Sequence, residues 1–68
     1  MFEHGYYQNK KNGCIYYAEK LLLNKSEGFD DTYVVEYYRK VNGHIDFDTG
    51  FARDLNQFLE KFDKVEVD

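Results

Sequence analysis

The hydrophobic residues follow a period of two through the middle of the chain and a period of about 3.6 near its C-terminal end. Residues 32–41 (TYVVEYYRKV) are rich in β-branched and aromatic side chains, and residues 44–51 alternate apolar and polar side chains. The Asn42-Gly43 pair between them favours a tight turn. The pattern therefore predicts a β-hairpin formed by residues 32–41 and 44–51.

The register of this hairpin depends on the length of its loop. A two-residue loop would place the apolar residues of the two strands on opposite faces of the sheet. A type I turn closed by a G1 bulge would keep them on one face, because it pairs Arg39 with Ile45 and Tyr37 with Phe47. We therefore expect the bulged hairpin.

The N-terminal part of the chain predicts two further strands. Residues 5–7 favour a short strand, and the polar residues that follow end in Asn12-Gly13, a second turn pair. Residues 14–23 form the next strand, but their apolar side chains occur at both parities, so the pattern does not show which face is buried. The segment 24–31 is polar and is expected to be a loop.

The last quarter of the chain predicts an amphipathic helix. Leu55, Phe58, Leu59 and Phe62 stand at positions i, i+3, i+4 and i+7, which places them on one stripe. A helix of about three turns is marginal by itself, so we expect the stripe to pack against the sheet. Residues 65–67 alternate again and could form a last short strand.

Together these elements predict one mainly β domain that spans residues 1–68, a curled antiparallel sheet of four to five strands packed by a C-terminal helix. The 68 residues include no proline, internal repeat or low-complexity tract, so no linker divides them. A core of this size commonly provides a net stability of about 3–5 kcal/mol. Such a small reserve makes a polar substrate cleft hard to support, and we therefore expect a protein that is not an enzyme.

The net charge and the cysteine content indicate which partners the protein binds and in which cellular compartment it is expected. Nine basic and thirteen acidic residues give a formal charge of −4, which opposes the phosphate attraction on which non-specific nucleic-acid binding depends. Cys14 has no second cysteine to pair with, and the N-terminus shows neither region of a signal peptide. The longest aliphatic run, residues 21–23, is far too short to cross a bilayer. We expect a cytoplasmic protein without nucleic-acid or membrane contacts.

Three segments resemble the motifs of a known family. Residues 7–13 (YQNKKNG), 33–39 (YVVEYYR) and 52–61 (ARDLNQFLEK) are similar to the consensus Y-R-H-Y-K-G-G, L-V-V-Y-R and R-P-L-x-x-F-L-E of a family of small bacterial and phage domains of unknown function. The resemblance covers most of the chain. It implies an SH3-like barrel of about five strands with a short helical segment near the end, and it implies no reaction.

The sequence differs from the family consensus at three positions of these motifs and agrees with it at others. Asn9 and Lys10 stand where the family has a histidine and an aromatic residue, and Asp54 stands where it has a proline. Whatever the family does at those three positions is therefore not carried over. The positions that match are Arg53, Leu55, Phe58 and Leu59.

Tyrosine and arginine supply the candidate ligand-binding residues. Aromatic residues make up 19% of the chain, and tyrosine suits a thin sheet because it has a ring to bury and a hydroxyl to keep in water. Stacking, cation–π contacts and bidentate hydrogen bonds could hold a peptide, a nucleobase or a nucleotide phosphate. The alternative is that these are packing residues and that Arg39 pairs with Asp46 or Glu36. The candidate set is Tyr16, Tyr38, Arg39 and Arg53, with Tyr6, Tyr7 and Tyr17 in the same sheet.

Two other groups of residues are interpreted as structural. His44, Asp46 and Asp48 could share one face of a strand and hold a divalent cation, but the segment lacks the glycine and the glutamate of an EF-hand loop. Cys14 beside His4 or His44 could form a nucleophile and its base, yet no catalytic signature surrounds it, and free cysteine usually behaves as a small buried hydrophobe. We predict no metal, no cofactor and no catalytic residue.

The first functional hypothesis is a non-enzymatic binding module that docks a protein segment or a small ligand on a Tyr-rich sheet face. The alternative is a phage-type inhibitor that sequesters a nucleotide signal, or that blocks a basic host protein by using acidic clusters as a mimic of nucleic acid. An exposed aromatic patch on so small a domain would also be compatible with a homodimer, which the pattern does not decide. The acidic clusters comprise Glu27, Asp30, Asp31, Asp46, Asp48, Asp63, Glu66 and Asp68.

Overall fold

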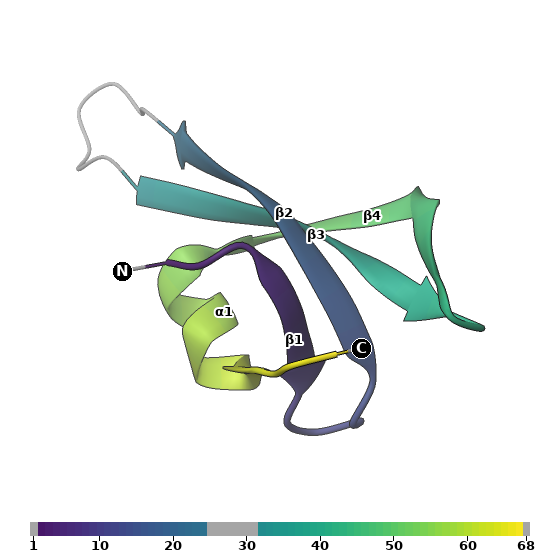
Figure 1. Ribbon diagram of the computed structural model, residues 1–68. Coiled ribbons are helices and arrows are strands. Elements are labelled where there is room, and N and C mark those ends of the chain that lie inside the picture. The colour runs from purple at the N-terminus through teal and green to yellow at the C-terminus, as the bar shows by residue number, and fades with distance from the viewer. Residues whose placement is uncertain (1, 25–31, 68) are drawn as a thin grey trace.

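Five antiparallel strands form one sheet in the order β4-β3-β2-β1-β5 in the computed structural model, which describes residues 2–24 and 32–67 (Figure 1). The outermost strands, β4 and β5, do not pair with each other, so the sheet is unclosed. This architecture confirms the prediction of a mainly β, curled antiparallel sheet. The predicted loop 24–31 lies outside the described residues except for Asn24, which is the last residue of β2. The strands are β1 (Gly5–Asn9), β2 (Ile15–Asn24), β3 (Thr32–Val41), β4 (His44–Asp54) and β5 (Phe62–Lys64).

One short helix, α1 (Leu55–Lys61), joins the two edge strands and lies inside the curl of the sheet (Figure 1). The Asp54 side chain caps its N-terminus by accepting a hydrogen bond from the backbone N–H of Gln57 at 3.2 Å. The helix ends earlier than predicted, because Phe62 is already extended and pairs with Asn9 of β1. Within the part of the chain that the structure describes, no helix is long and apolar enough to cross a membrane.

The last strand also comes earlier than predicted. β5 occupies residues 62–64, and residues 65–67 are not in a strand, although the backbone N–H of Val65 still donates to the carbonyl oxygen of Tyr6 at 3.1 Å. The pairing of β5 with β1 therefore begins at Phe62, which was predicted to be the last residue of the helical apolar stripe.

The core lies between the inner face of the curled sheet and α1. Phe58 is fully buried, and its ring stacks on that of Phe62 with centroids 4.4 Å apart. The predicted packing of the apolar stripe against the sheet is confirmed for these two residues and for the half-buried Leu55, whereas Leu59 is 45% exposed and faces solvent. The buried core residues are Tyr7, Ala18, Val35, Tyr37, Phe58 and Phe62.

A bulge in β2 explains why its apolar residues occur at both parities. The register against β3 shifts between Ala18 and Lys20, which leaves Glu19 without a partner. Ala18 before the bulge and Leu21 after it therefore both face the core, although one number is even and the other odd. The His4 side chain contacts the bulge: its Nδ1 lies 2.7 Å from the carbonyl oxygen of Glu19.

The turn between β3 and β4 corrects the predicted register. Asn42 and Gly43 both have positive φ, at 51° and 80°, which is the geometry of a two-residue type I′ turn. Lys40 therefore pairs with Ile45, and the bulged turn that would pair Arg39 with Ile45 is wrong.

The register between β3 and β4 changes further along the hairpin. Between the pairs Arg39 with Asp46 and Tyr38 with Gly50, residues 47–49 of β4 have no partner on β3. This shift by three residues pairs Tyr37 with Phe51 on the core side of the sheet instead of with Phe47, whose ring contacts Tyr38.

Candidate functional site

Three tyrosines lie side by side on the face of the sheet that points away from α1. Tyr6 of β1 pairs with Tyr17 of β2, and Tyr17 pairs with Tyr38 of β3. Each is followed or preceded in sequence by a buried residue, namely Tyr7, Ala18 and Tyr37. Because neighbouring side chains of a strand point to opposite faces, Tyr6, Tyr17 and Tyr38 form a row on the outer face, which we call the tyrosine row.

Within the tyrosine row the rings of Tyr6 and Tyr17 contact each other, and Tyr38 and Tyr6 each contact one flanking side chain. The ring centroids of Tyr6 and Tyr17 are 5.3 Å apart, and those of Tyr38 and Phe47 are 5.0 Å apart. The Nζ atom of Lys40 lies 5.1 Å from the centroid of the Tyr6 ring, which is a cation–π distance. The three tyrosines are half-buried, and Phe47 is 60% exposed.

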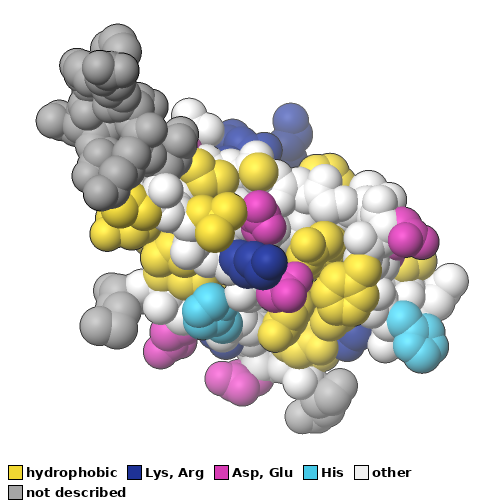
Figure 2. All heavy atoms as spheres, turned by 90° about the horizontal axis from the view of Figure 1, so that it is seen from above, with side chains coloured by type: hydrophobic (Ala, Val, Ile, Leu, Met, Phe, Trp, Pro, Cys, Tyr) yellow, Lys and Arg dark blue, Asp and Glu magenta, His cyan; other side chains and the backbone are white. Residues whose placement is uncertain are grey.

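Figure 2 shows the molecule from above the view of Figure 1. Hydrophobic side chains gather over this face, with basic and acidic side chains between them. The tyrosine row itself combines aromatic rings with the ammonium group of Lys40, and aromatic side chains are enriched at surfaces that bind other molecules.

Of the four predicted site residues, Tyr38 lies in the tyrosine row and the other three lie on the opposite face. Tyr16 is part of the packing around the core: its ring centroid is 5.3 Å from that of Phe62 and 5.5 Å from that of Tyr37. The structure therefore does not bring the four residues together on one surface.

Arg39 pairs in register with Tyr16 and Asp46, at the end of the inner face. Its Nη2 donates a hydrogen bond to the Sγ atom of Cys14 at 3.6 Å. Among the described residues it makes no ion pair with Asp46 or Glu36, and Cys14 is half-buried rather than buried. The cysteine precedes the first residue of β2, so it stays at the margin of the core.

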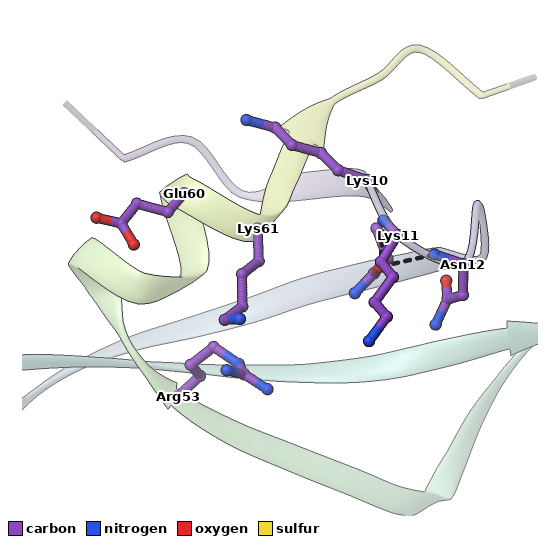
Figure 3. A pocket seen from close by; sticks show the side chains of 7 residues that line it. Lys10, Lys11, Asn12, Arg53, Glu60 and Lys61 are labelled. Atoms are coloured by element: carbon purple, nitrogen blue, oxygen red, sulfur yellow. Dashed lines mark hydrogen bonds between the residues drawn. The ribbon is translucent and has the colours of Figure 1, made fainter.

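Arg53 of β4 borders a cavity of about 340 Å³ between the β1–β2 turn, the end of α1 and β4 (Figure 3). Its Nε donates to the hydroxyl of Tyr37 at 3.4 Å, which links the guanidinium to the core. The cavity is lined by Asn9, Lys10, Lys11, Asn12, Arg53, Glu60 and Lys61.

Among the residues that the structure describes, the Tyr7 hydroxyl is the titratable group whose pKa is clearly shifted. Its ring is buried against Phe58, with centroids 4.9 Å apart, and its O–H donates to the carbonyl oxygen of Glu3 at 2.6 Å. Burial raises the pKa of this hydroxyl above its ordinary value of 10.0. Tyr7 therefore serves the core and is not presented to a ligand.

The other predicted groups are the possible cation ligands on β4 and the acidic clusters. The 47–49 irregularity separates His44 and Asp46 from the regular part of β4, and Asp46 accepts a hydrogen bond from the backbone N–H of Asp48 at 3.0 Å. Across residues 2–24 and 32–67, no three His, Cys, Asp or Glu side chains gather as a metal site. Of the acidic clusters, Glu27, Asp30, Asp31 and Asp68 lie outside the described residues.

Comparison of the chain with protein-family models, with curated proteins and with solved structures finds no match. The resemblance to the family of small bacterial and phage domains therefore stays a prediction, and the site is interpreted from its own geometry.

Proposed function

We propose that this protein is a non-enzymatic binding module that docks an extended protein segment across the tyrosine row. The observation that carries the proposal is the register of Tyr6, Tyr17 and Tyr38 on three adjacent strands, which lines up three rings on the face opposite the helix. Interior packing does not require these rings, because the core is filled from the other face.

The spacing of the rings suits a proline-rich segment. Two strand spacings amount to about 9.6 Å, and three residues of a polyproline II helix rise about 9.3 Å. A segment that runs across the strands would thus place residues i and i+3 on the rings of Tyr6 and Tyr38, with Tyr17 beneath the residues between them. Such a segment is already extended, so docking costs little ordering entropy. The tyrosine hydroxyls would donate to its carbonyl oxygens.

A titration with a ten-residue oligoproline peptide tests this function, with a glycine-serine peptide of equal length as the control. We expect saturable shifts in the NMR spectrum for residues of the tyrosine row with oligoproline and none with the control peptide. Binding through rings should change little between low and moderate salt, because ionic screening acts on charges.

Paired substitutions locate the docking face. Tyr17→Ala removes the central ring of the row and should weaken oligoproline binding by about tenfold or more, as is typical of an aromatic anchor. Tyr33→Ala is the matched control, because Tyr33 is 47% exposed but lies at the start of β3, outside the row. Equal affinities for the two variants, or shifts confined to residues of the inner face, would overturn the proposal.

A further inference from the structure

The cavity beside Arg53 gathers positive charge in an otherwise acidic protein. Four of its lining residues are basic, Lys10, Lys11, Arg53 and Lys61, and one, Glu60, is acidic. The whole sequence has nine basic and thirteen acidic residues. The cavity is therefore lined mainly by basic side chains, although the chain as a whole has a net negative charge.

Three of these cations face the same space. Figure 3 shows the Lys61 side chain extending from the end of α1 toward Arg53 on β4, while Lys11 extends from the β1–β2 turn into the same region. Glu60 points away from them, and Lys10 lies on the other side of the turn, where its Nζ is 3.7 Å from Oδ1 of Asp63. The inward-facing cations thus have no facing carboxylate among the residues that line the cavity.

The backbone holds these cations in place. The N–H of Lys10 donates to the carbonyl oxygen of Lys61 at 2.9 Å, which ties the β1–β2 turn to the end of the helix. Within the turn, Oδ1 of Asn9 accepts the N–H groups of Lys11 and Asn12 at 2.8 and 3.0 Å. Nε of Arg53 donates to the Tyr37 hydroxyl, and among the described residues its two terminal nitrogens make no hydrogen bond, so they can bind an oxyanion.

We propose that this cavity binds a small phosphomonoester, with the phosphoryl oxygens between Lys11, Arg53 and Lys61. A phosphomonoester carries a charge of about −1.5 to −2 at pH 7, which offsets the mutual repulsion of three cations better than a single carboxylate does. The cavity volume of about 340 Å³ is at the lower end of the range for small-molecule sites and leaves room for a sugar-sized group.

The lining favours a sugar phosphate over a nucleotide. None of the seven lining residues is aromatic, so a nucleobase would find no ring on which to stack inside the cavity. Asn9 and Asn12 supply side-chain amides at the rim that suit sugar hydroxyls. This site is separate from the tyrosine row and does not depend on the proposed docking of a protein segment.

NMR titration of the full chain with inorganic phosphate, ribose 5-phosphate, adenosine monophosphate and unphosphorylated ribose tests the site. We expect saturable shifts at Lys11, Asn12, Arg53 and Lys61 with the three phosphate compounds and none with ribose. Ribose 5-phosphate should bind more tightly than inorganic phosphate and no more weakly than adenosine monophosphate. Binding should weaken between low and moderate salt, since it depends on charge.

Two substitutions and one control decide whether the three cations act as a site. Arg53→Gln and Lys61→Gln should each weaken ribose 5-phosphate binding by about tenfold or more, because each removes a charged hydrogen-bond donor. Lys10→Gln should change it by less than about threefold, since the Lys10 ammonium faces Asp63. Lys61 is exposed, so its variant remains informative if Arg53→Gln disturbs the packing of Tyr37.

The proposal fails if no saturable shift occurs with any phosphate compound, or if Lys10→Gln weakens binding as much as Lys61→Gln. The second result would mean that the ligand responds to general surface charge and not to this cavity. Tyr17→Ala should leave ribose 5-phosphate binding unchanged, so failure of this site and failure of the protein-docking function can be told apart.

Discussion

The ring of Tyr38 on β3 lies against the backbone of Gly50 on β4. A Cβ atom at position 50 would be 3.0 Å from Cε1 of that ring, closer than ordinary van der Waals contact. The two residues are cross-strand partners, and the absence of a side chain at position 50 lets the tyrosine ring pack directly on the backbone. The position of the Tyr38 ring, at the β4 end of the tyrosine row, therefore depends on a glycine of the neighbouring edge strand.

Gly50→Ala should displace the Tyr38 ring while costing less than about 1 kcal/mol of stability, because a side chain at the surface can move aside. Nuclear Overhauser contacts between the Tyr38 and Phe47 rings, which are 5.0 Å apart, report the displacement. We expect these contacts to weaken and oligoproline binding to fall with them. Unchanged contacts in the Gly50→Ala protein would contradict the prediction.

Gly43→Ala separates backbone strain from steric contact. No atom of residues 2–24 or 32–67 lies within 4 Å of the added methyl group, but φ at this position is 80°. The substitution should lower the free energy of unfolding by about 1 kcal/mol, the cost of a left-handed conformation for a residue with a Cβ. Urea unfolding measures the loss, and Asn42→Gly is the control, because glycine accepts the φ of 51° at that position without strain.

Phe58→Ala should leave the domain largely unfolded at 25 °C. Phe58 is fully buried and contacts the rings of Tyr7, Tyr37 and Phe62, so its removal should cost about 3–5 kcal/mol. A domain of this size has a total stability of about the same amount.

Leu59→Ala, one residue further along the helix, is the matched control for that experiment. Leu59 is 45% exposed, and its truncation should cost less than about 1 kcal/mol. Circular dichroism during urea unfolding distinguishes the two variants. Equal unfolding midpoints for Phe58→Ala and Leu59→Ala would show that the core is not centred on Phe58.

Asp54→Ala should destabilise the protein by about 1 kcal/mol, because it removes the side chain that caps α1. The carboxylate accepts the N–H of Gln57 at 3.2 Å, which satisfies one of the N–H groups that the start of this seven-residue helix leaves without an intrahelical partner. Asp54→Asn keeps the acceptor and should lose much less stability. Thermal unfolding of the two variants checks the difference.

Stability should fall in the alkaline range, above about pH 10, as Tyr7 ionises. Burial raises the pKa of Tyr7 in the folded protein above its ordinary value of 10.0, so the folded state keeps a proton that the unfolded state releases. The contribution is fully present below pH 10 and is lost as the pH rises through the folded pKa. For one group the slope is at most about 1.4 kcal/mol per pH unit.

Unfolding of the parent and of Tyr7→Phe between pH 8 and pH 11 measures this slope. The variant should be less stable at pH 8 by about 1 kcal/mol, because it loses the hydrogen bond to Glu3. Its stability should also fall less steeply above pH 10. Identical slopes for the two proteins would show that Tyr7 does not cause the alkaline loss.

The limits of prediction from this sequence lie at its irregular positions. Strand β3 was predicted with its observed bounds, since its β-branched and aromatic run is unambiguous, and α1 was predicted from its apolar stripe. The bulge at Glu19 and the unpaired residues 47–49 were not predicted, because a register shift depends on the pairing of both strands and leaves no periodic signal in either one. Phe62 suits a helix and a strand equally, and pairing with β1 decides between them.

The candidate site was predicted less well than the fold for the same physical reason. Tyr38 was predicted, but which tyrosines share its face depends on the register across β1, β2 and β3. Tyr16 and Tyr17 are adjacent in sequence and belong to opposite faces, so composition alone could not separate the core residue from the surface residue. The position of Lys11, Arg53 and Lys61 around one cavity depends on contacts between a turn, a strand and a helix end, none of which is local in sequence.

The unpaired residues 47–49 have a consequence for the solubility of an open sheet. An exposed edge strand offers a continuous line of backbone groups to which another chain can add, which is how fibrils and aggregates begin. In β4 the pairing with β3 is interrupted after Asp46 and resumes at Gly50, so each regularly paired stretch is short and carries at least one acidic residue. We expect the irregularity that places Phe51 on the core also to make the free edge of β4 a poor template for intermolecular β-pairing.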